Sequence, residues 1–140
     1  MTAEALIDTN ILVYAFDEAE RAKQKKAKKF MEEKFSEKSA VLSAQNLAEF
    51  HSISTRKIER PIRKELAQEI IREFSASYKI INYNEKTVQN AIQIEIAFRV
   101  HFWDALLAAT MQENNLTTIY TENIADFGKI SWIKAVNPLK

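Results

Sequence analysis

The feature that most constrains the fold of this chain is the regular alternation of short apolar runs with longer amphipathic stretches. The apolar runs lie at residues 5–7, 40–43, 78–81, 117–120 and 130–136, and stretches with helical periodicity separate them. Short, continuously apolar strands joined by helices are typical of a parallel sheet that helices cover on both faces. The sequence therefore predicts a three-layer α/β/α fold with a short, mainly parallel central sheet.

Helical periodicity and capping residues predict the helices between these runs. Residues 18–36 place apolar side chains at helical spacing among many lysines, and residues 44–58 form the next helical stretch. Pro61 suits the first turn of the following helix, and Asn84 is suited to cap another. Trp103 opens a later, nearly all-apolar helix and is expected to lie in the core.

Composition excludes several classes of function. Gly128 is the only glycine, so the chain has neither a P-loop nor a dinucleotide-binding GxGxxG loop. The absence of cysteine excludes thiol nucleophiles and cysteine-ligated zinc. No apolar run approaches the ~18 residues that span a bilayer, and residues 1–8 lack the form of a basic-then-apolar export leader. We therefore predict a cytoplasmic protein without a membrane anchor, organised as one domain over residues 1–140.

Three carboxylates stand where a charged side chain is unexpected. Asp8 directly follows an apolar run, Asp104 lies in the nearly all-apolar segment "FWDALLAATM", and Glu49 borders an apolar helical arc. In parallel α/β sheets, ligands bind beyond the carboxyl ends of the strands, where Asp8 and Asp126 are both expected. An unpaired buried carboxylate needs a cation or strong donors. These acids together predict a site for a hard, oxygen-preferring ion such as Mg²⁺.

Each of these acids, taken alone, also fits an ordinary structural role. Asp8 is a suitable helix cap, and the helix dipole favours Asp104 near a helix start whatever its chemistry. Glu49 suits a solvated helix surface, and Asp126 suits a loop. Only their combination favours a common site.

The order of the motifs carries a family resemblance. Along nearly the whole chain run "LIDTNILVYAF", "NLAEF", "FWDALLAA", "IYTENIADF" and a closing "VNP". In this order the chain resembles the PIN-domain nucleases, most of all the small VapC-type toxins of toxin–antitoxin pairs. The resemblance implies that Asp8, Glu49 and Asp104 are metal-binding catalytic acids. The family's fourth acid usually stands third in a Thr-x-Asp stretch, a place that Asn123 occupies here; Asn123 and Asp126 therefore both remain candidates to complete the site.

The resemblance implies a metal-dependent endoribonuclease that uses Mg²⁺ or Mn²⁺, forms a homodimer and is silenced by a small antitoxin protein. Metal ions held by carboxylates suit phosphodiester hydrolysis on chemical grounds as well, because they acidify a bound water and neutralise phosphate charge. Two alternatives stay open. One is a catalytically weak PIN-type module that binds RNA or protein, which the Asn123 departure favours, and the other is a DNA nuclease of related chemistry.

Basic and polar residues near the acids are the candidate substrate contacts. The formal net charge of +1 creates no overall field for nucleic acid, so binding must rest on local patches. The predicted contacts are Arg56, Lys57, Thr9, Asn10 and Thr121. The first two follow Glu49 closely enough to grip a phosphate backbone, and the other three either orient Asp8 or contact phosphate. The lysines of residues 21–29 do not share one helical face, so a solvated surface fits them as well as a nucleic-acid track.

Overall fold

A computed structural model describes residues 3–140 of the chain. Within these residues, five strands form one sheet: β1 (Ala5–Ile7), β2 (Ala40–Ser43), β3 (Lys79–Ile81), β4 (Thr118–Tyr120) and β5 (Lys134–Val136). They lie in the order β3-β2-β1-β4-β5, and every neighbouring pair is parallel. The predicted parallel sheet is confirmed.

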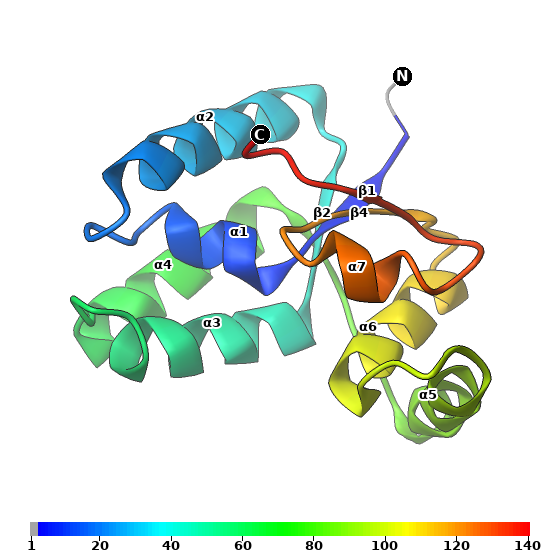
Figure 1. Cartoon of the computed structure of the whole chain (residues 1–140). Helices are drawn as coiled ribbons and strands as arrows, with labels where there is room; N and C mark the ends of the chain where they lie inside the picture. The colour runs from blue at the N-terminus through cyan, green and yellow to red at the C-terminus, as the bar shows by residue number, and fades with distance from the viewer. Residues whose placement is uncertain (1–2) are drawn as a thin grey trace.

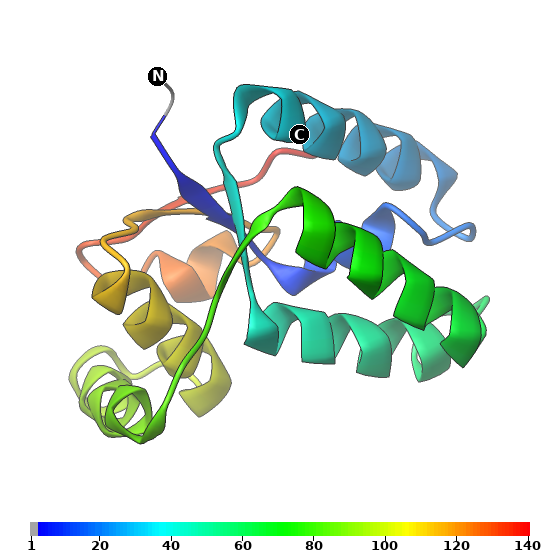
Figure 2. The ribbon, with the colours of Figure 1, turned by 180° about the vertical axis from the view of Figure 1, so that it is seen from behind.

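Helices cover both faces of this sheet (Figures 1 and 2). They are α1 (Thr9–Tyr14), α2 (Arg21–Glu37), α3 (Ala44–Arg56), α4 (Lys64–Ser77), α5 (Glu85–Phe98), α6 (Phe102–Glu113) and α7 (Ile124–Phe127). Helices α1 to α4 lie on one face, and α5 to α7 lie on the other. The three-layer α/β/α architecture is confirmed.

Two apolar cores lie on the two faces of the sheet because side chains alternate along each strand. In β1, Leu6 belongs to the core under α5 and α6, whereas Ile7 belongs to the core under α1 to α4. In the second core, the fully buried Phe50 of α3 makes edge-to-face contacts with Phe16 and Phe74. This packing fixes where α1, α3 and α6 stand relative to the strand ends.

The prediction for Pro61 is wrong. Helix α4 begins only at Lys64, and Pro61 lies in the irregular segment before it. The segment is held against the end of α3, where the backbone N–H of Ile62 donates to the carbonyl oxygen of Ser54 at 2.9 Å. This long-range bond gives the chain a turn before the helix starts.

The prediction that Trp103 lies in the core is also wrong, because its side chain is 59% exposed. Full burial in α6 begins at Ala105, and in the first turn Phe102 packs against the core whereas Trp103 lies on the exposed side. Asn84 does cap α5 as predicted, since its side chain accepts the backbone N–H groups of Lys86 and Thr87. Within residues 3–140, no helix combines the length and the apolar character needed to cross a bilayer.

Candidate metal centre

The carboxyl ends of β1 and β4 form the floor of an acidic pocket. Asp8 follows β1 directly, and its backbone N–H donates to the carbonyl oxygen of Tyr120 at the end of β4 at 2.9 Å. A pocket of about 410 Å³ opens here, and Asp8, Glu49, Asp104 and Asn123 all line it. The structure thus brings together four residues that are spread over more than a hundred positions of the sequence.

Asp8 is both a helix cap and a pocket residue. One carboxylate oxygen accepts the backbone N–H of Thr9 at 2.8 Å, and the other accepts the hydroxyl of Thr121 at 2.8 Å. Burial raises the pKa of the Asp8 carboxyl from 3.8 to about 6, and the nearby charges of Glu49 and Asp104 add to the rise. The two hydrogen bonds act in the opposite direction and are outweighed. The environment of Asp8 therefore disfavours the charged form of its carboxyl group.

Glu49 is tied to the start of α1 by one threonine. The hydroxyl of Thr9 donates to Glu49 Oε1 at 2.8 Å and accepts a hydrogen bond from Asn46 Nδ2 at 2.9 Å. Asn46 also forms a capping box with Ser43 at the N-terminus of α3, so its side chain is fixed on both sides. The local sequence that starts α3 therefore also sets the position of Glu49.

Asp104 lies in the first turn of α6, half-buried at the edge of the pocket. Burial raises the pKa of its carboxyl, the charges of Asp126 and Glu49 add to this, and His101 acts against it. Nearby, Gln45 Nε2 donates to the carbonyl oxygen of Trp103 at 2.9 Å and lies 3.5 Å from Glu49 Oε2. This glutamine links the two helices that carry Glu49 and Asp104.

The donor chemistry of the pocket fits a hard divalent cation. None of the ion pairs within residues 3–140 includes Asp8, Glu49 or Asp104, so their charges face one another without a basic partner. In the same part of the chain, no three acidic or histidine side chains converge tightly enough to enclose an ion by themselves. A cation with oxygen ligands that keeps several of its waters, as Mg²⁺ does, matches this arrangement.

The two candidates for the fourth position have different surroundings. Asn123 lines the pocket, and its backbone N–H donates to the hydroxyl oxygen of Thr121 at 2.8 Å. Asp126 lies on the short helix α7, which the sequence did not predict, and its carboxylate pairs with Lys129 at 3.5 Å. Asp126 is not among the residues that line the pocket, although its charge acts on Asp104.

The other polar residues predicted near the site bond to the protein itself. The buried hydroxyl of Thr121 accepts Asn10 Nδ2 at 3.3 Å in addition to donating to Asp8. Asn10 Oδ1 accepts the backbone N–H of Glu122 at 3.3 Å. The side chains of Thr9 and Thr121 therefore orient the carboxylates of Glu49 and Asp8. Asn10 holds the loop that follows β4.

Glu122, the one acid in that loop, does not line the pocket. Burial alone would raise the pKa of the Glu122 carboxyl, but hydrogen bonds from Lys23 and Tyr14 outweigh burial and lower it. Sequence patterns did not predict this contact or the contacts of Gln45 and Asn46. A Ser-x-x-Asn pattern at residues 43–46 is a local signal for the Asn46 cap, whereas no local signal points to the contact of Lys23.

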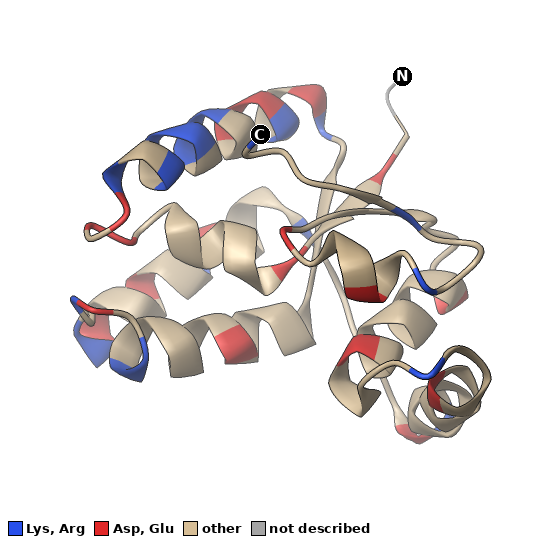
Figure 3. Cartoon of the chain, viewed as in Figure 1, with Lys and Arg blue, Asp and Glu red and all other residues tan. Residues whose placement is uncertain are grey.

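Basic residues lie to the side of the acids. Figure 3 shows acidic positions at the start of α1, within α3, at the start of α6 and on α7, and basic positions along α2 and at the far end of α3. Arg56 and Lys57 are exposed at that end of α3. They do not line the pocket, whereas the next residue, Ile58, does. The predicted substrate contacts of α3 therefore stand at the rim.

Comparisons with known proteins identify the family and the fold. A family model described as PIN domain matches residues 5–132. The fold is similar to that of a toxin–antitoxin complex from Klebsiella pneumoniae, at 22% identity and a TM-score of 0.69, covering 96% of this chain and 98% of that chain. It is also similar to that of a DNA-bound VapBC complex from Salmonella typhimurium, at 15% identity and a TM-score of 0.72, with 98% and 99% covered.

A third similar structure is Mycobacterium tuberculosis VapC20, described as a toxin that cleaves the sarcin-ricin loop. It shares 14% identity at a TM-score of 0.69, with 93% of this chain and 97% of that chain covered. At these identities the likeness shows the fold. No curated protein sequence matches the chain.

Proposed function

This chain belongs to the PIN domain family, and we propose that it is a metal-dependent endoribonuclease that hydrolyses RNA phosphodiester bonds with Mg²⁺ or Mn²⁺. The observation that carries the proposal is the convergence of Asp8, Glu49 and Asp104 on one pocket without a basic partner. When bound, the ion would supply an acidified water and would neutralise charge on the phosphate.

In this proposal the protein's own groups divide into ligands and positioning residues. Asp8, Glu49 and Asp104 hold the ion. The hydroxyls of Thr9 and Thr121 donate to Glu49 and Asp8 respectively. The second oxygen of Asp8 accepts the Thr9 backbone N–H, and that of Glu49 lies 3.5 Å from Gln45 Nε2. A carboxylate oxygen has more than one lone pair, so these bonds leave capacity for an ion. Such second contacts on ligands orient the donor atoms. Thr9, Asn10 and Thr121 therefore act by orientation, the first of the two roles predicted for them.

Asn123 and Asp126 complete the proposed site in different ways. Asn123 offers an amide oxygen from within the pocket lining. Asp126 pairs with Lys129 and does not line the pocket, so it reaches the ion only if its side chain moves. The amide of Asn123 in the place of a fourth acid is the observation that favours the second candidate function, a catalytically weak module that binds RNA or protein.

We extend the proposal to a cytoplasmic toxin that is silenced by an antitoxin protein and forms a homodimer. Solved structures of the same fold include toxin–antitoxin complexes. Several apolar side chains are exposed on α5 and α6 and could supply a protein interface; they are Ile92, Ile96 and Trp103. Sedimentation velocity at micromolar concentration should show a dimer of this 16.2 kDa chain. A monomer at every concentration would contradict the homodimer.

Cleavage of a mixed RNA and DNA panel tests the proposed function. We expect cut RNA with Mg²⁺ or Mn²⁺ and intact RNA in EDTA, because a bound ion would acidify the attacking water and neutralise phosphate charge. Intact RNA with every metal, from protein with a native circular dichroism spectrum, would favour the binding module. Cuts in DNA alone would favour the DNA nuclease.

Replacing Arg56 and Lys57 together with alanine should weaken RNA binding and lessen its salt dependence. Both side chains are exposed beside the pocket, where they can contact phosphates. Losing two contacts to a single strand lowers the slope of log K against log salt by about 1.4, at roughly 0.7 per contact. Binding is measured in EDTA across a salt series, with the exposed pair Lys28 and Lys29, also changed to alanine, as the matched control. An unchanged slope would remove the two residues from the RNA contact.

A further inference from the structure

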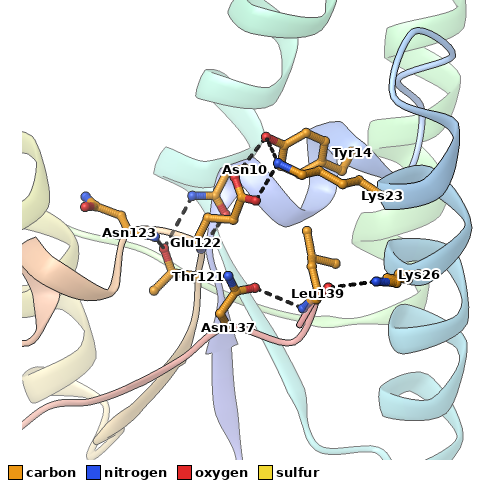
Figure 4. A network of polar contacts seen from close by, with 9 residues as sticks. All are labelled: Asn10, Tyr14, Lys23, Lys26, Thr121, Glu122, Asn123, Asn137 and Leu139. Carbon is orange, nitrogen blue, oxygen red and sulfur yellow. Dashed lines mark hydrogen bonds and ion pairs between the residues drawn. The ribbon is translucent and has the colours of Figure 1, made fainter.

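One lysine of the basic helix α2 is turned inward onto a glutamate next to the metal centre. Lys23 Nζ lies 2.8 Å from Glu122 Oε2 and donates to the hydroxyl of Tyr14 at 3.2 Å. The Tyr14 hydroxyl in turn donates to Glu122 Oε1 at 2.8 Å. The three side chains come from α2, α1 and the loop after β4, and Figure 4 shows them closing on one another. We call these three residues the clamp.

The clamp holds the middle residue of the segment that faces the pocket. Glu122 stands between Thr121, which donates to Asp8, and Asn123, which lines the pocket. Its backbone N–H donates to Asn10 Oδ1, so the loop is held from its side chain and from its backbone. A shift of Glu122 therefore moves the two neighbours that touch the metal centre.

The arrangement has more contacts than an ordinary surface ion pair. Exposed pairs contribute little because solvent screens them and two long side chains must be ordered. Here the side chains of Lys23 and Glu122 are only 39% and 27% exposed, and the ammonium also lies 4.7 Å from the centroid of the Tyr14 ring. A shared hydroxyl and an aromatic face thus reduce the freedom of the pair.

A second lysine of α2 also makes an inward contact. Lys26 Nζ donates to the carbonyl oxygen of Leu139 at 3.3 Å, and the backbone N–H of Leu139 donates to Asn137 Oδ1 at 2.9 Å. Lys23 and Lys26 are three residues apart and so share a helix face. The lysines that remain exposed on the helix include Lys25, Lys28 and Lys29. The ammonium groups of Lys23 and Lys26 thus contact other segments of the domain, although Lys26 as a whole is exposed.

We propose that the clamp of Lys23, Tyr14 and Glu122 positions Thr121 and Asn123 at the metal centre, with Lys23 as a positioning residue and not a contact to RNA. The inference rests on the proposed nuclease function for its purpose, although its geometry is independent of activity. It also assigns Glu122 a structural partner, so that this carboxylate does not take the place of the missing fourth acid.

The test compares Lys23→Met, which keeps the apolar stem and removes the ammonium, with Lys25→Met on the exposed face of the same helix. In metal-free, isotope-labelled protein, Lys23→Met should shift the side-chain amide signals of Asn10 and Asn123, and Lys25→Met should not. Calorimetric titration with Mn²⁺ should show affinity weakened about tenfold for Lys23→Met only, the loss typical of a residue that supports metal ligands. In cleavage, Lys23→Met should lower kcat and leave KM near the wild-type value.

The charge-swapped protein Lys23→Glu with Glu122→Lys should recover the amide signals and most of the Mn²⁺ affinity. If Lys23→Met unfolds, Tyr14→Phe removes a single hydroxyl of the clamp and should produce a smaller change of the same kind. Wild-type amide signals and Mn²⁺ affinity in both variants would overturn the proposal. The proposal would also be overturned if Lys23→Met weakened RNA binding and its salt dependence without shifting the Asn123 amide signal. That result would mean that Lys23 contacts RNA directly. If wild-type protein cuts no RNA, the amide signals and Mn²⁺ affinity still decide on the clamp.

Discussion

Asp8→Asn should reduce metal-dependent RNA cleavage by about 1,000-fold, which corresponds to roughly 4 kcal/mol of transition-state stabilisation. Asparagine retains an oxygen that accepts the Thr9 N–H, so the cap of α1 and the fold are kept. It lacks the negative charge that holds the cation in the pocket. The measurement is the single-turnover rate with saturating RNA and Mn²⁺, with the circular dichroism spectrum as the check on folding.

Asp17→Asn is the matched control for this loss of one carboxylate. Asp17 lines the same pocket, but its carboxylate accepts the backbone N–H of Ala19 at 3.1 Å and so serves a local turn. Its variant should cut RNA within a few-fold of the wild-type rate. Full activity of Asp8→Asn would show that the site assignment is wrong.

Two further variants separate the candidates for the fourth position. Asp126→Asn should retain cleavage if the carboxylate stays paired with Lys129 outside the pocket. A loss as large as that of Asp8→Asn would instead make Asp126 a ligand. Asn123→Asp adds a carboxylate to the pocket lining and should tighten Mn²⁺ binding, because a charged oxygen attracts the ion more strongly than an amide oxygen.

In the metal-free protein, Asp8→Asn should increase the free energy of unfolding above pH 7, which is the second large effect that we expect. Burial raises the pKa of Asp8 from 3.8 to about 6 in the folded state, a difference equivalent to about 3 kcal/mol. The variant loses the acceptor for the Thr121 hydroxyl, which costs about 1 kcal/mol. A net gain of about 2 kcal/mol in the free energy of unfolding follows.

The pH dependence of this gain has a definite sign. Because the folded-state pKa is raised, protonation of Asp8 favours the folded state, and this contribution is complete below pH 3.8. It is lost as the pH rises toward 6, so the wild-type protein weakens over this range while the asparagine variant does not. Urea unfolding of both proteins in EDTA should show stabilities that diverge from pH 4 to pH 6 and then run parallel.

Added Mn²⁺ provides the control for this stability measurement. A cation that binds the charged site stabilises the wild-type fold by mass action, so the gap between the two proteins should close or reverse at neutral pH. Equal urea midpoints for both metal-free proteins from pH 4 to pH 8 would contradict the buried, charge-disfavouring environment assigned to Asp8.

The order of strands and helices could be predicted from the sequence because it depends on local patterns. Short, mostly apolar runs such as 5–7 and 40–43 are typical of strands covered on both faces, and these became β1 and β2. A parallel sheet then brings strand ends to one edge, so the place of Asp8 followed from its position just after a strand. The convergence of Asp8, Glu49 and Asp104 on one pocket agrees with that prediction.

Other features depended on contacts between segments that are distant in the sequence, and only the tertiary structure decided them. The path of the loop after β4 places Asn123 in the pocket lining and carries Asp126 onto α7, where it pairs with Lys129. Trp103 looked like a core residue because its helix is apolar, but it lies on the exposed side of the first turn of α6, next to Phe102, which packs against the core. Lys23 looked like one surface lysine among many, yet α2 docks so that this lysine meets Glu122, 99 positions later in the chain. Periodicity specifies which face of an element is apolar, whereas the packing of all the elements determines which polar groups at their ends meet.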